Sequence, residues 1–129
     1  MKKFIYFLIL NLLFIGTSFA YEYNYNRLMG VKTMTNEAKQ IRAEHILVKD
    51  YSRAIELKEK INNGESFEEL ARENSLCPSG KQGGDLGYFT RGQMVKPFED
   101  AAFSTEVGKV SDPIQTQFGW HLIKVVDKK

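Results

Sequence analysis

The order of apolar patterns along the chain predicts an α+β domain. Strand-like alternation occurs at residues 42–48 and again at 120–126, and helix-like spacing occupies much of the region between them. A helical middle with a strand at each end is typical of the α+β class. A chain of 129 residues has the size of a single domain, and its hydrophobic content of 43% is enough for a modest core.

The first 20 residues differ in composition from the rest of the chain. Two lysines near the start precede an apolar run over residues 4–16, and small residues follow at Ser18 and Ala20. This layout predicts a signal peptide at 1–20 that is cleaved after Ala20, so that the protein is exported to a periplasm or secreted. The alternative is an uncleaved membrane anchor, but the apolar run is short against the roughly 20 residues of a spanning helix. We therefore expect no stable membrane span after cleavage.

Residues 21–40 show no sustained helical or strand period. Tyr21, Tyr23 and Tyr25 alternate with polar residues, and a strand this short would be marginal without a partner strand. We interpret residues 21–40 as a mobile arm or linker. The globular domain is expected at residues 41–129.

The first predicted strand covers residues 42–48. Its alternation places Ala43, His45 and Leu47 on one face. The opposite face carries Glu44, followed by two aliphatic residues. The strand is therefore expected to present a histidine to one side of a sheet.

Two helices are predicted between residues 50 and 74. In the first, apolar residues recur at helical spacing, Asp50 or Ser52 can cap the start, and Gly64 follows the end as a stop signal. The second begins at the Ser66-x-x-Glu69 capping box and should end near Asn74. The apolar stripes of the two helices consist of Ala54, Leu57, Ile61, Phe67, Leu70 and Ala71.

The stretch 77–103 is rich in glycine and is the least regular part of the chain. It presents Leu86, Met94 and Phe98 at spacings that no single helix or strand could bring together. We interpret it as a loop that shapes a pocket, since glycine allows positive φ and close approach to a ligand. The alternative is an ordinary surface loop with common turn chemistry.

The last part of the chain contains a helix start and two strand-like segments. Pro97 suits the first position of a helix, and acidic residues follow in its first turn. Pro113 has no amide hydrogen, which indicates an edge position or a break near residues 110–114. Residues 120–126 are apolar on both faces, as in a central strand that is covered on both sides. Pairing of the two end strands would make His45 and His121 neighbours.

Charge and composition exclude several classes of function. The sequence contains 18 basic and 16 acidic residues, and two of the lysines lie in the predicted leader, so the mature chain has 16 of each. A neutral chain lacks the positive charge that phosphate backbones require, and we expect no nucleic acid partner. The glycine-rich stretch also lacks the spacing and the Lys-Ser/Thr ending of a P-loop.

The chain has one thiol, Cys77, and two imidazoles, His45 and His121. No two of them are closely spaced in the way of metal ligands, so no metal is expected. A Cys–His hydrolase would need an activated thiolate and an oxyanion hole, and no local signature supports one. Without further context, the default interpretation of two histidines on apolar strands is a hydrogen-bonded structural pair in the core. A lone cysteine cannot form an internal disulfide, so Cys77 is either buried and inert or functional.

Six blocks of sequence between residues 42 and 127 follow one another in a specific order. They are HILVK at 45–49, GESFEELA at 64–71, CPSG at 77–80, GGDLG at 83–87, RGQMVKPF at 91–98 and FGWHLIKV at 118–125. Together they resemble the parvulin family of peptidyl-prolyl cis-trans isomerases. The resemblance covers about two thirds of the chain, and it implies a four-stranded antiparallel sheet with about four surrounding helices.

The resemblance also assigns candidate site residues. It implies a proline pocket formed by Leu86, Met94 and Phe98, with Phe118 as an additional apolar wall.

The same resemblance implies a catalytic set around the two histidines. His45 and His121 would lie beneath the pocket and Cys77 at its rim. Thr116 resembles the threonine that joins the histidine hydrogen-bond network. Family members that require a phosphorylated residue before proline carry a basic cluster after the first strand. This chain has only Lys49 and Arg53 there, separated by Asp50, so we expect no phosphate requirement.

The implied reaction suits these residues. Rotation about an Xaa-Pro bond meets a barrier of roughly 18–20 kcal/mol because the amide loses its resonance. No bond is broken, so neither a cofactor nor a nucleophile is obligatory. A dry pocket that favours the twisted, less polar amide over the planar one lowers the barrier.

We therefore expect an exported prolyl isomerase that assists the folding of secreted or envelope proteins. Its partners would be proline-containing segments of unfolded or partly folded polypeptides, and it is expected to be a monomer. The alternative is a non-catalytic holdase chaperone or peptide-binding module that uses the same groove, together with the tyrosine-rich arm. A third hypothesis is a structural adhesin or envelope-bound module, which a stable partner without turnover would indicate.

Overall fold

The computed structural model describes residues 37–129. The predicted signal peptide at 1–20 and the segment 21–36 of the predicted arm lie outside the described residues. The folded unit spans Ala38–Lys129. The backbone of Gln40 exchanges two hydrogen bonds with that of Lys129, at 3.1 and 2.9 Å, so the last residues of the predicted arm are tied to the domain.

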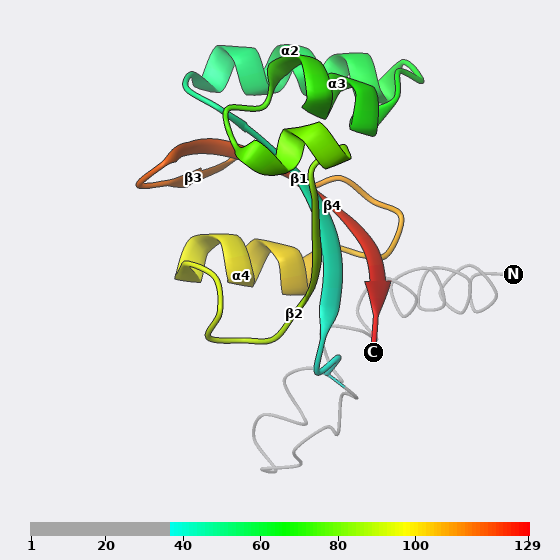
Figure 1. Ribbon diagram of the computed structural model, residues 1–129, viewed down its shortest axis with the longest axis vertical. Helices are drawn as coiled ribbons and strands as arrows, with labels where there is room; N and C mark the ends of the chain where they lie inside the picture. Colours follow the sequence, from blue (N-terminus) through cyan, green and yellow to red (C-terminus); the bar gives the residue numbers. More distant parts are fainter. Residues whose placement is uncertain (1–36) are drawn as a thin grey trace, which may run out of the picture. The chain divides into compact units, whose positions relative to one another are not determined.

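An antiparallel sheet of four strands in the order β2-β1-β4-β3 organises the domain (Figure 1). The strands are β1 (Ile41–Val48), β2 (Asp85–Phe89), β3 (Ile114–Thr116) and β4 (Gly119–Lys128). The two strands predicted at the ends of the domain, β1 and β4, lie side by side in its centre. The predicted pairing of remote strands and the α+β class are confirmed.

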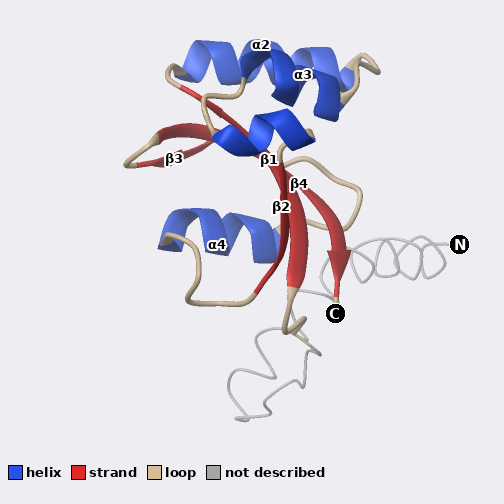
Figure 2. Cartoon of the chain, viewed as in Figure 1, coloured by secondary structure: helices blue, strands red, loops and turns tan. Residues whose placement is uncertain are grey.

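Helices pack on both faces of the sheet (Figures 1 and 2). They are α2 (Tyr51–Asn62), α3 (Phe67–Asn74), the short 3-10 helix η1 (Pro78–Gln82) and α4 (Lys96–Ser104). The expectation of about four helices corresponds to three α-helices and one 3-10 helix among residues 37–129. No helix in this range combines the length and apolar character needed to cross a bilayer.

Each face of the sheet has its own hydrophobic core. The core beneath α2 and α3 contains Ile46, Val48, Ala54, Leu57, Phe67, Leu70, Ala71 and Leu122. The core beneath α4 contains Ile41, Ala43, Phe89, Phe98, Ala102, Ile123 and Val125. Neighbouring residues of β4, such as Leu122 and Ile123, belong to opposite cores because successive side chains of a strand point to opposite faces. The prediction of a central strand covered on both sides is therefore confirmed.

Local signals explain where the helices begin. The Ser66 hydroxyl accepts the Glu69 N–H at 3.3 Å, as an N-cap should. The capping box is only half formed, because the Glu69 carboxylate pairs with Arg72 at 2.5 Å instead of returning to the cap. Asp50 occupies the cap position of α2 without a side-chain hydrogen bond to the helix. Pro97 is the second residue of α4 and not the first, since the helix begins at Lys96.

The glycine-rich stretch holds more regular structure than its pattern predicts. The interpretation of residues 77–103 as a loop was wrong in part, because η1 and β2 lie within it, whereas α4 at its end was predicted from Pro97. Gly87 lies in the middle of β2 and has a φ of +67°, which interrupts the extended backbone of the strand. A glycine at this position also interrupts the alternation of apolar and polar side chains by which a strand is recognised in the sequence. The edge prediction near Pro113 is confirmed, since β3 begins at the next residue and is an edge strand.

Candidate active site

A groove of about 550 Å³ opens on the α4 side of the sheet. It is lined by His45, Leu47, Leu76, Cys77, Pro78, Leu86, Gln93, Met94, Val95, Phe98, Phe118 and His121. None of these twelve residues is an aspartate, glutamate, lysine or arginine. The groove is therefore an uncharged, mostly apolar site at physiological pH, provided that its histidines are neutral.

The four residues assigned to the proline pocket all line this groove, although they come from different elements. Leu86 lies on β2, Met94 in the segment between β2 and α4, and Phe98 on α4. Phe118 lies in the turn between β3 and β4 and is 61% exposed, which makes it a rim residue. Phe98 is only 3% exposed and belongs to the core as well as to the groove.

The two histidines lie at the base of the groove on adjacent strands. They are not directly opposite in the β1–β4 ladder, since His45 faces Ile123 and His121 faces Leu47, so the two rings meet diagonally. Their Nδ1 atoms are 3.1 Å apart, and the ring planes are inclined by only 16°. The Phe98 ring meets both imidazoles edge-on, with centroid distances of 5.6 and 5.3 Å.

The imidazole pair is the middle of a longer hydrogen-bonded chain. The outer nitrogen of His45, Nε2, lies 3.0 Å from the Ser79 hydroxyl. The outer nitrogen of His121, Nε2, lies 2.8 Å from the Thr116 hydroxyl, which also accepts the Phe118 N–H. A neutral imidazole has one donor and one acceptor, so all three side-chain bonds are satisfied when every donor points the same way along the chain. Two such arrangements exist, one with the donors running toward Ser79 and one toward Thr116.

Burial keeps this pair uncharged. Desolvation lowers the pKa of His45 to about 4, and the nearness of His121 adds to this effect. Desolvation alone lowers the pKa of His121 to about 4. Both groups are at most 5% exposed, so water gives little support to a charge. Near pH 7 the histidines are neutral hydrogen-bonding groups.

Cys77 lies at the start of η1, where its side chain is half-buried and lines the groove. Its N–H donates to the Ser75 hydroxyl at 3.3 Å, and its carbonyl accepts the Gly80 N–H at 3.0 Å. These bonds fix the backbone that carries both Cys77 and Ser79. Within residues 37–129, no group of histidine, cysteine or carboxylate side chains could hold a metal ion.

A glycine beside β1 sets the position of His45. The His45 N–H donates to the Gly84 carbonyl at 2.9 Å, and a Cβ on residue 84 would lie 2.2 Å from the His45 carbonyl oxygen. Gly84 also has a φ of +86°, a conformation that other residues rarely adopt. The glycine therefore lets the chain approach β1 at the point where the histidine enters the groove.

Ser79 was not among the predicted site residues, although it lies in the Cys77–Gly80 block on which the resemblance rests. A hydroxyl two residues after a groove cysteine is an uninformative signal by itself. Only the fold of η1 brings it to His45, which is 34 positions away in the sequence. Leu76, Pro78 and Gln93 were missed as groove residues for the same reason.

The comparisons with known proteins identify the family. The model of the PPIC-type PPIASE domain matches residues 23–129. The chain belongs to the PPIC-type PPIase family. The predicted resemblance to the parvulins is thereby confirmed.

Several members of this PPIase family are similar along most of the described chain. Foldase protein PrsA of Geobacillus sp. (strain WCH70) is 54% identical over 95 residues, which are 73% of this chain and 34% of that protein. A 1.70 Å crystal structure of peptidylprolyl isomerase (PrsA) from Bacillus anthracis matches with a TM-score of 0.70 and 47% identity, over 72% of this chain and 43% of that one.

The smaller parvulins match over almost their whole length. The solution structure of NmPin, the parvuline of Nitrosopumilus maritimus, has a TM-score of 0.65 and 50% identity, over 70% of this chain and 98% of that one. By contrast, the chain spans about a third of the length of the curated relatives it matches. The PPIase domain is thus common to all of these proteins, whereas the curated relatives contain further sequence.

Proposed function

We propose that this chain catalyses cis–trans isomerisation of Xaa-Pro bonds in exported polypeptides that are unfolded or partly folded, and thereby assists their folding. The observation that carries the proposal is the uncharged groove with a neutral histidine pair at its base. Membership of the PPIase family supports the same reaction. The proposed activity needs no cofactor, because no covalent bond is made or broken.

The groove walls would lower the rotation barrier by binding the proline ring and excluding water. A planar amide is more polar than the twisted form in which resonance is lost, so a water-poor site destabilises the ground state relative to the transition state. Leu86, Met94 and Phe98 are assigned to this seat, with Phe118 at its rim. Each factor of ten in rate corresponds to about 1.4 kcal/mol of this preference.

The hydrogen-bonded chain from Ser79 to Thr116 is assigned a positioning and electrostatic role. In either of its two arrangements the chain gives each neutral imidazole one donor and one acceptor, so it holds both rings in place without putting a charge in the groove. Cys77 is assigned to the rim, where its half-buried side chain adds to the wall. The proposed reaction involves no covalent attack by sulfur.

The proposed substrates do not require a phosphate. The groove lining contains no cation, and the candidate basic residue Arg53 is already engaged, with Glu56 at 2.6 Å and with the Asn74 side chain at 2.5 Å. A phosphate would therefore find no free guanidinium at this position. We propose that unphosphorylated Xaa-Pro segments are the substrates.

The predicted leader supports an extracytoplasmic location, in a periplasm or outside the cell. The proposed partners are polypeptide segments that contain proline, and a neutral mature chain supports neither nucleic acid binding nor strong non-specific charge interactions. A monomeric domain is sufficient for this reaction, since all the groove residues come from one chain.

The decisive experiment measures cis–trans exchange of a panel of short Xaa-Pro peptides by NMR, with and without the full chain. Wild-type protein should accelerate exchange, and Met94→Ala should lose most of this rate while keeping its circular dichroism spectrum. Val107→Ala is a matched control, because Val107 is an exposed apolar residue that does not line the groove. No acceleration by folded wild-type protein would refute the proposal.

A second candidate function is that of a holdase, and the rim of the groove favours it. Leu76 and Phe118 are 64% and 61% exposed, so the groove entrance offers apolar surface to an unfolded chain. A holdase would suppress aggregation of a client that lacks proline, and Phe118→Ser would weaken this effect. Isomerase activity without any such suppression would exclude the second function.

A further inference from the structure

One wall of the groove is formed by a segment that has no regular structure of its own. Residues 90–95 connect β2 to α4, and they contribute Gln93, Met94 and Val95 to the groove lining. The Thr90 N–H donates to the Gln93 side chain at 2.7 Å, and the Gln93 N–H donates back to the Thr90 carbonyl at 3.4 Å. These bonds close the segment on itself, so they do not determine where it sits over the groove.

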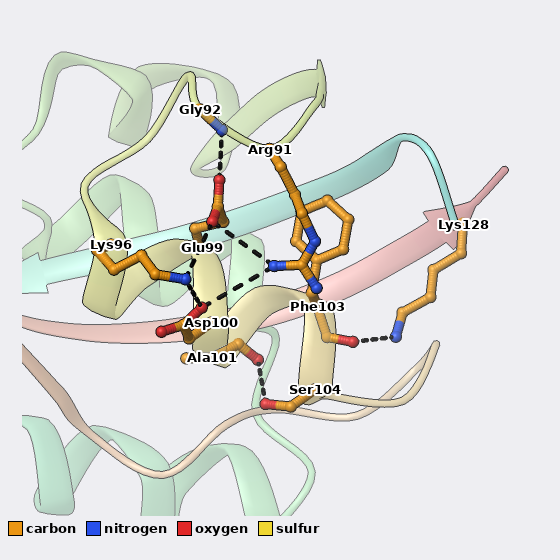
Figure 3. A network of polar contacts seen from close by, with 9 residues as sticks. All are labelled: Arg91, Gly92, Lys96, Glu99, Asp100, Ala101, Phe103, Ser104 and Lys128. Atoms are coloured by element: carbon orange, nitrogen blue, oxygen red, sulfur yellow. Dashed lines mark hydrogen bonds and ion pairs between the residues drawn. The ribbon is translucent and has the colours of Figure 1, made fainter. Parts of the chain in front are cut away.

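Glu99 connects this segment to the folded body. Its carboxylate reaches back from the first turn of α4 and accepts the Gly92 N–H at 2.5 Å (Figure 3). The Glu99 side chain is only 6% exposed. A hydrogen bond between a buried carboxylate and an amide is among the stronger kinds, because one partner is charged and water does not compete.

The conformation of Gly92 serves this bond. Its φ is +90°, and a Cβ at this position would meet no heavy atom within 4 Å. Space therefore does not require a glycine here, whereas the backbone conformation does. The left-handed turn aims the Gly92 amide at Glu99 in place of solvent.

Two cations balance the buried carboxylate, Arg91 from the segment and Lys96 from the start of α4. Arg91 Nη1 and Lys96 Nζ lie 3.6 and 3.7 Å from Glu99 Oε2 (Figure 3). The Arg91 guanidinium also lies 4.2 Å from the centre of the Phe103 ring on α4. Asp100 shares the same cations, at 2.7 Å from Lys96 and 3.9 Å from Arg91, but its side chain is 55% exposed.

We infer that Glu99 is a positioning residue, which holds the segment 90–95 so that Met94 faces the groove. Helix α4 then provides two walls of the groove, one directly through Phe98 and one through the bond from Glu99 to Gly92. The inference rests on the proposed isomerase function, because it assigns Glu99 to the same site. Its chemical basis is the acceptor oxygen, and the negative charge is secondary.

Three variants of the full chain separate these contributions. Glu99→Ala removes the acceptor and should lower kcat/KM for an Xaa-Pro peptide about tenfold, since small displacements of a binding wall have large effects on rate. Glu99→Gln keeps an acceptor oxygen for Gly92 and should restore activity to within about threefold of wild type. Asp100→Ala is the matched control, because it removes a carboxylate from the same cations but keeps the acceptor of the Gly92 N–H, and it should leave activity unchanged.

Amide hydrogen exchange at Gly92 provides a readout of the segment itself. The Gly92 N–H should be protected in wild type and in Glu99→Gln and should exchange at least tenfold faster in Glu99→Ala, while the NMR signals of His45 and His121 stay in place. If Glu99→Ala does not fold, Glu99→Asp replaces it, because its shorter side chain draws the carboxylate back from Gly92. Activity or Gly92 protection that is unchanged in Glu99→Ala, or in Glu99→Asp where that variant replaces it, would overturn the inference.

The two proposals fail in different ways. If the wild type does not isomerise any peptide, the proposed function fails, and the exchange of Gly92 still reports whether Glu99 holds the segment. If wild type is active and Glu99→Gln is as impaired as Glu99→Ala, the acceptor role is wrong, and the charge of Glu99 must matter instead.

Discussion

The histidine pair predicts that the domain loses stability on mild acidification. The perturbation is a change from pH 8 to pH 5.5, across which an unfolded histidine with a pKa near 6.5 becomes largely protonated. In the folded domain both pKa values lie at about 4, so the buried imidazoles stay neutral. The unfolded state therefore binds more protons, and stability rises with pH between about 4 and 6.5.

The magnitude follows from the two pKa values. For one histidine with a pKa of about 4 folded and 6.5 unfolded, linkage gives a loss of roughly 1.4 kcal/mol between pH 8 and pH 5.5. Since the chain contains two histidines and both are in this pair, the total loss is about 3 kcal/mol. That is a large part of the stability of an ordinary domain.

The Glu44 carboxyl has the opposite effect on the pH dependence of stability. Burial raises the pKa of Glu44, so the folded state holds this proton more tightly than the unfolded state does, and its contribution to stability falls as pH rises. Glu44→Gln removes this effect. The pH dependence of that variant should be at least as steep as that of wild type.

The assay is urea unfolding at a series of pH values, followed by the fluorescence of Trp120, the single tryptophan. NMR titration of the imidazole signals measures the two pKa values directly. His121→Asn removes one proton-binding site from both states, so its loss between pH 8 and 5.5 should be half of the wild-type value or less. A wild-type loss below about 1 kcal/mol, or imidazoles that titrate above pH 6 in the folded state, would refute the reasoning.

Three further changes have predictable effects. Ser79→Ala removes the hydroxyl partner of His45 and should lower stability by about 1 kcal/mol and kcat/KM several-fold, as measured by urea unfolding and peptide exchange. Gly84→Ala should cost more than about 2 kcal/mol, because the new methyl group would clash with the His45 carbonyl and the backbone would be strained. Lys124→Met should cost about 2 kcal/mol near pH 7, because it removes the cation that lies 2.6 Å from the Glu68 carboxylate and 3.6 Å from the buried Oε2 of Glu44. The part of that cost that comes from Glu44 should shrink as the pH falls, because burial raises the pKa of this carboxyl and so favours its protonated, uncharged form.

Matched controls exist for these variants. Gly108→Ala has a similar φ of +82° but open space around the new methyl group, so it should cost only the backbone strain of about 1 kcal/mol. If Gly108→Ala destabilises the domain as much as Gly84→Ala does, the cost of Gly84→Ala does not come from close packing against β1. Ser104→Ala removes an exposed hydroxyl that bonds only within α4 and should not affect activity.

Local patterns of apolar residues predicted the longer elements of the domain. β1, α2 and α3 lie within a residue or two of the predicted ranges, because each carries its own apolar stripe and end signals. β1 and β4 have a further property in common, since the apolar residues of each strand point to two cores. The predicted start of α4 at Pro97 is one residue from the observed start at Lys96.

The glycine-rich region was not predictable from its pattern in this way. β2 is a short edge strand with a left-handed glycine in its middle, and its pairing with β1 is what makes it a strand. η1 is a single short 3-10 segment, whose side chains show no helical stripe. Such elements depend on partners that are distant in the sequence.

The sequence by itself determined the class of fold and the main elements, because alternation, helical spacing and capping are local properties that each segment carries in its own residues. It determined the family through six ordered blocks that resemble the parvulins. Only the tertiary structure decided which side chains meet. His45 and His121 are 76 positions apart. Ser79 on η1 meets His45 on β1, and Glu99 on α4 meets Gly92 in the segment 90–95, only in the folded domain. The low pKa values of the histidines have the same origin, because desolvation depends on everything that packs around a group and not on its neighbours in the chain.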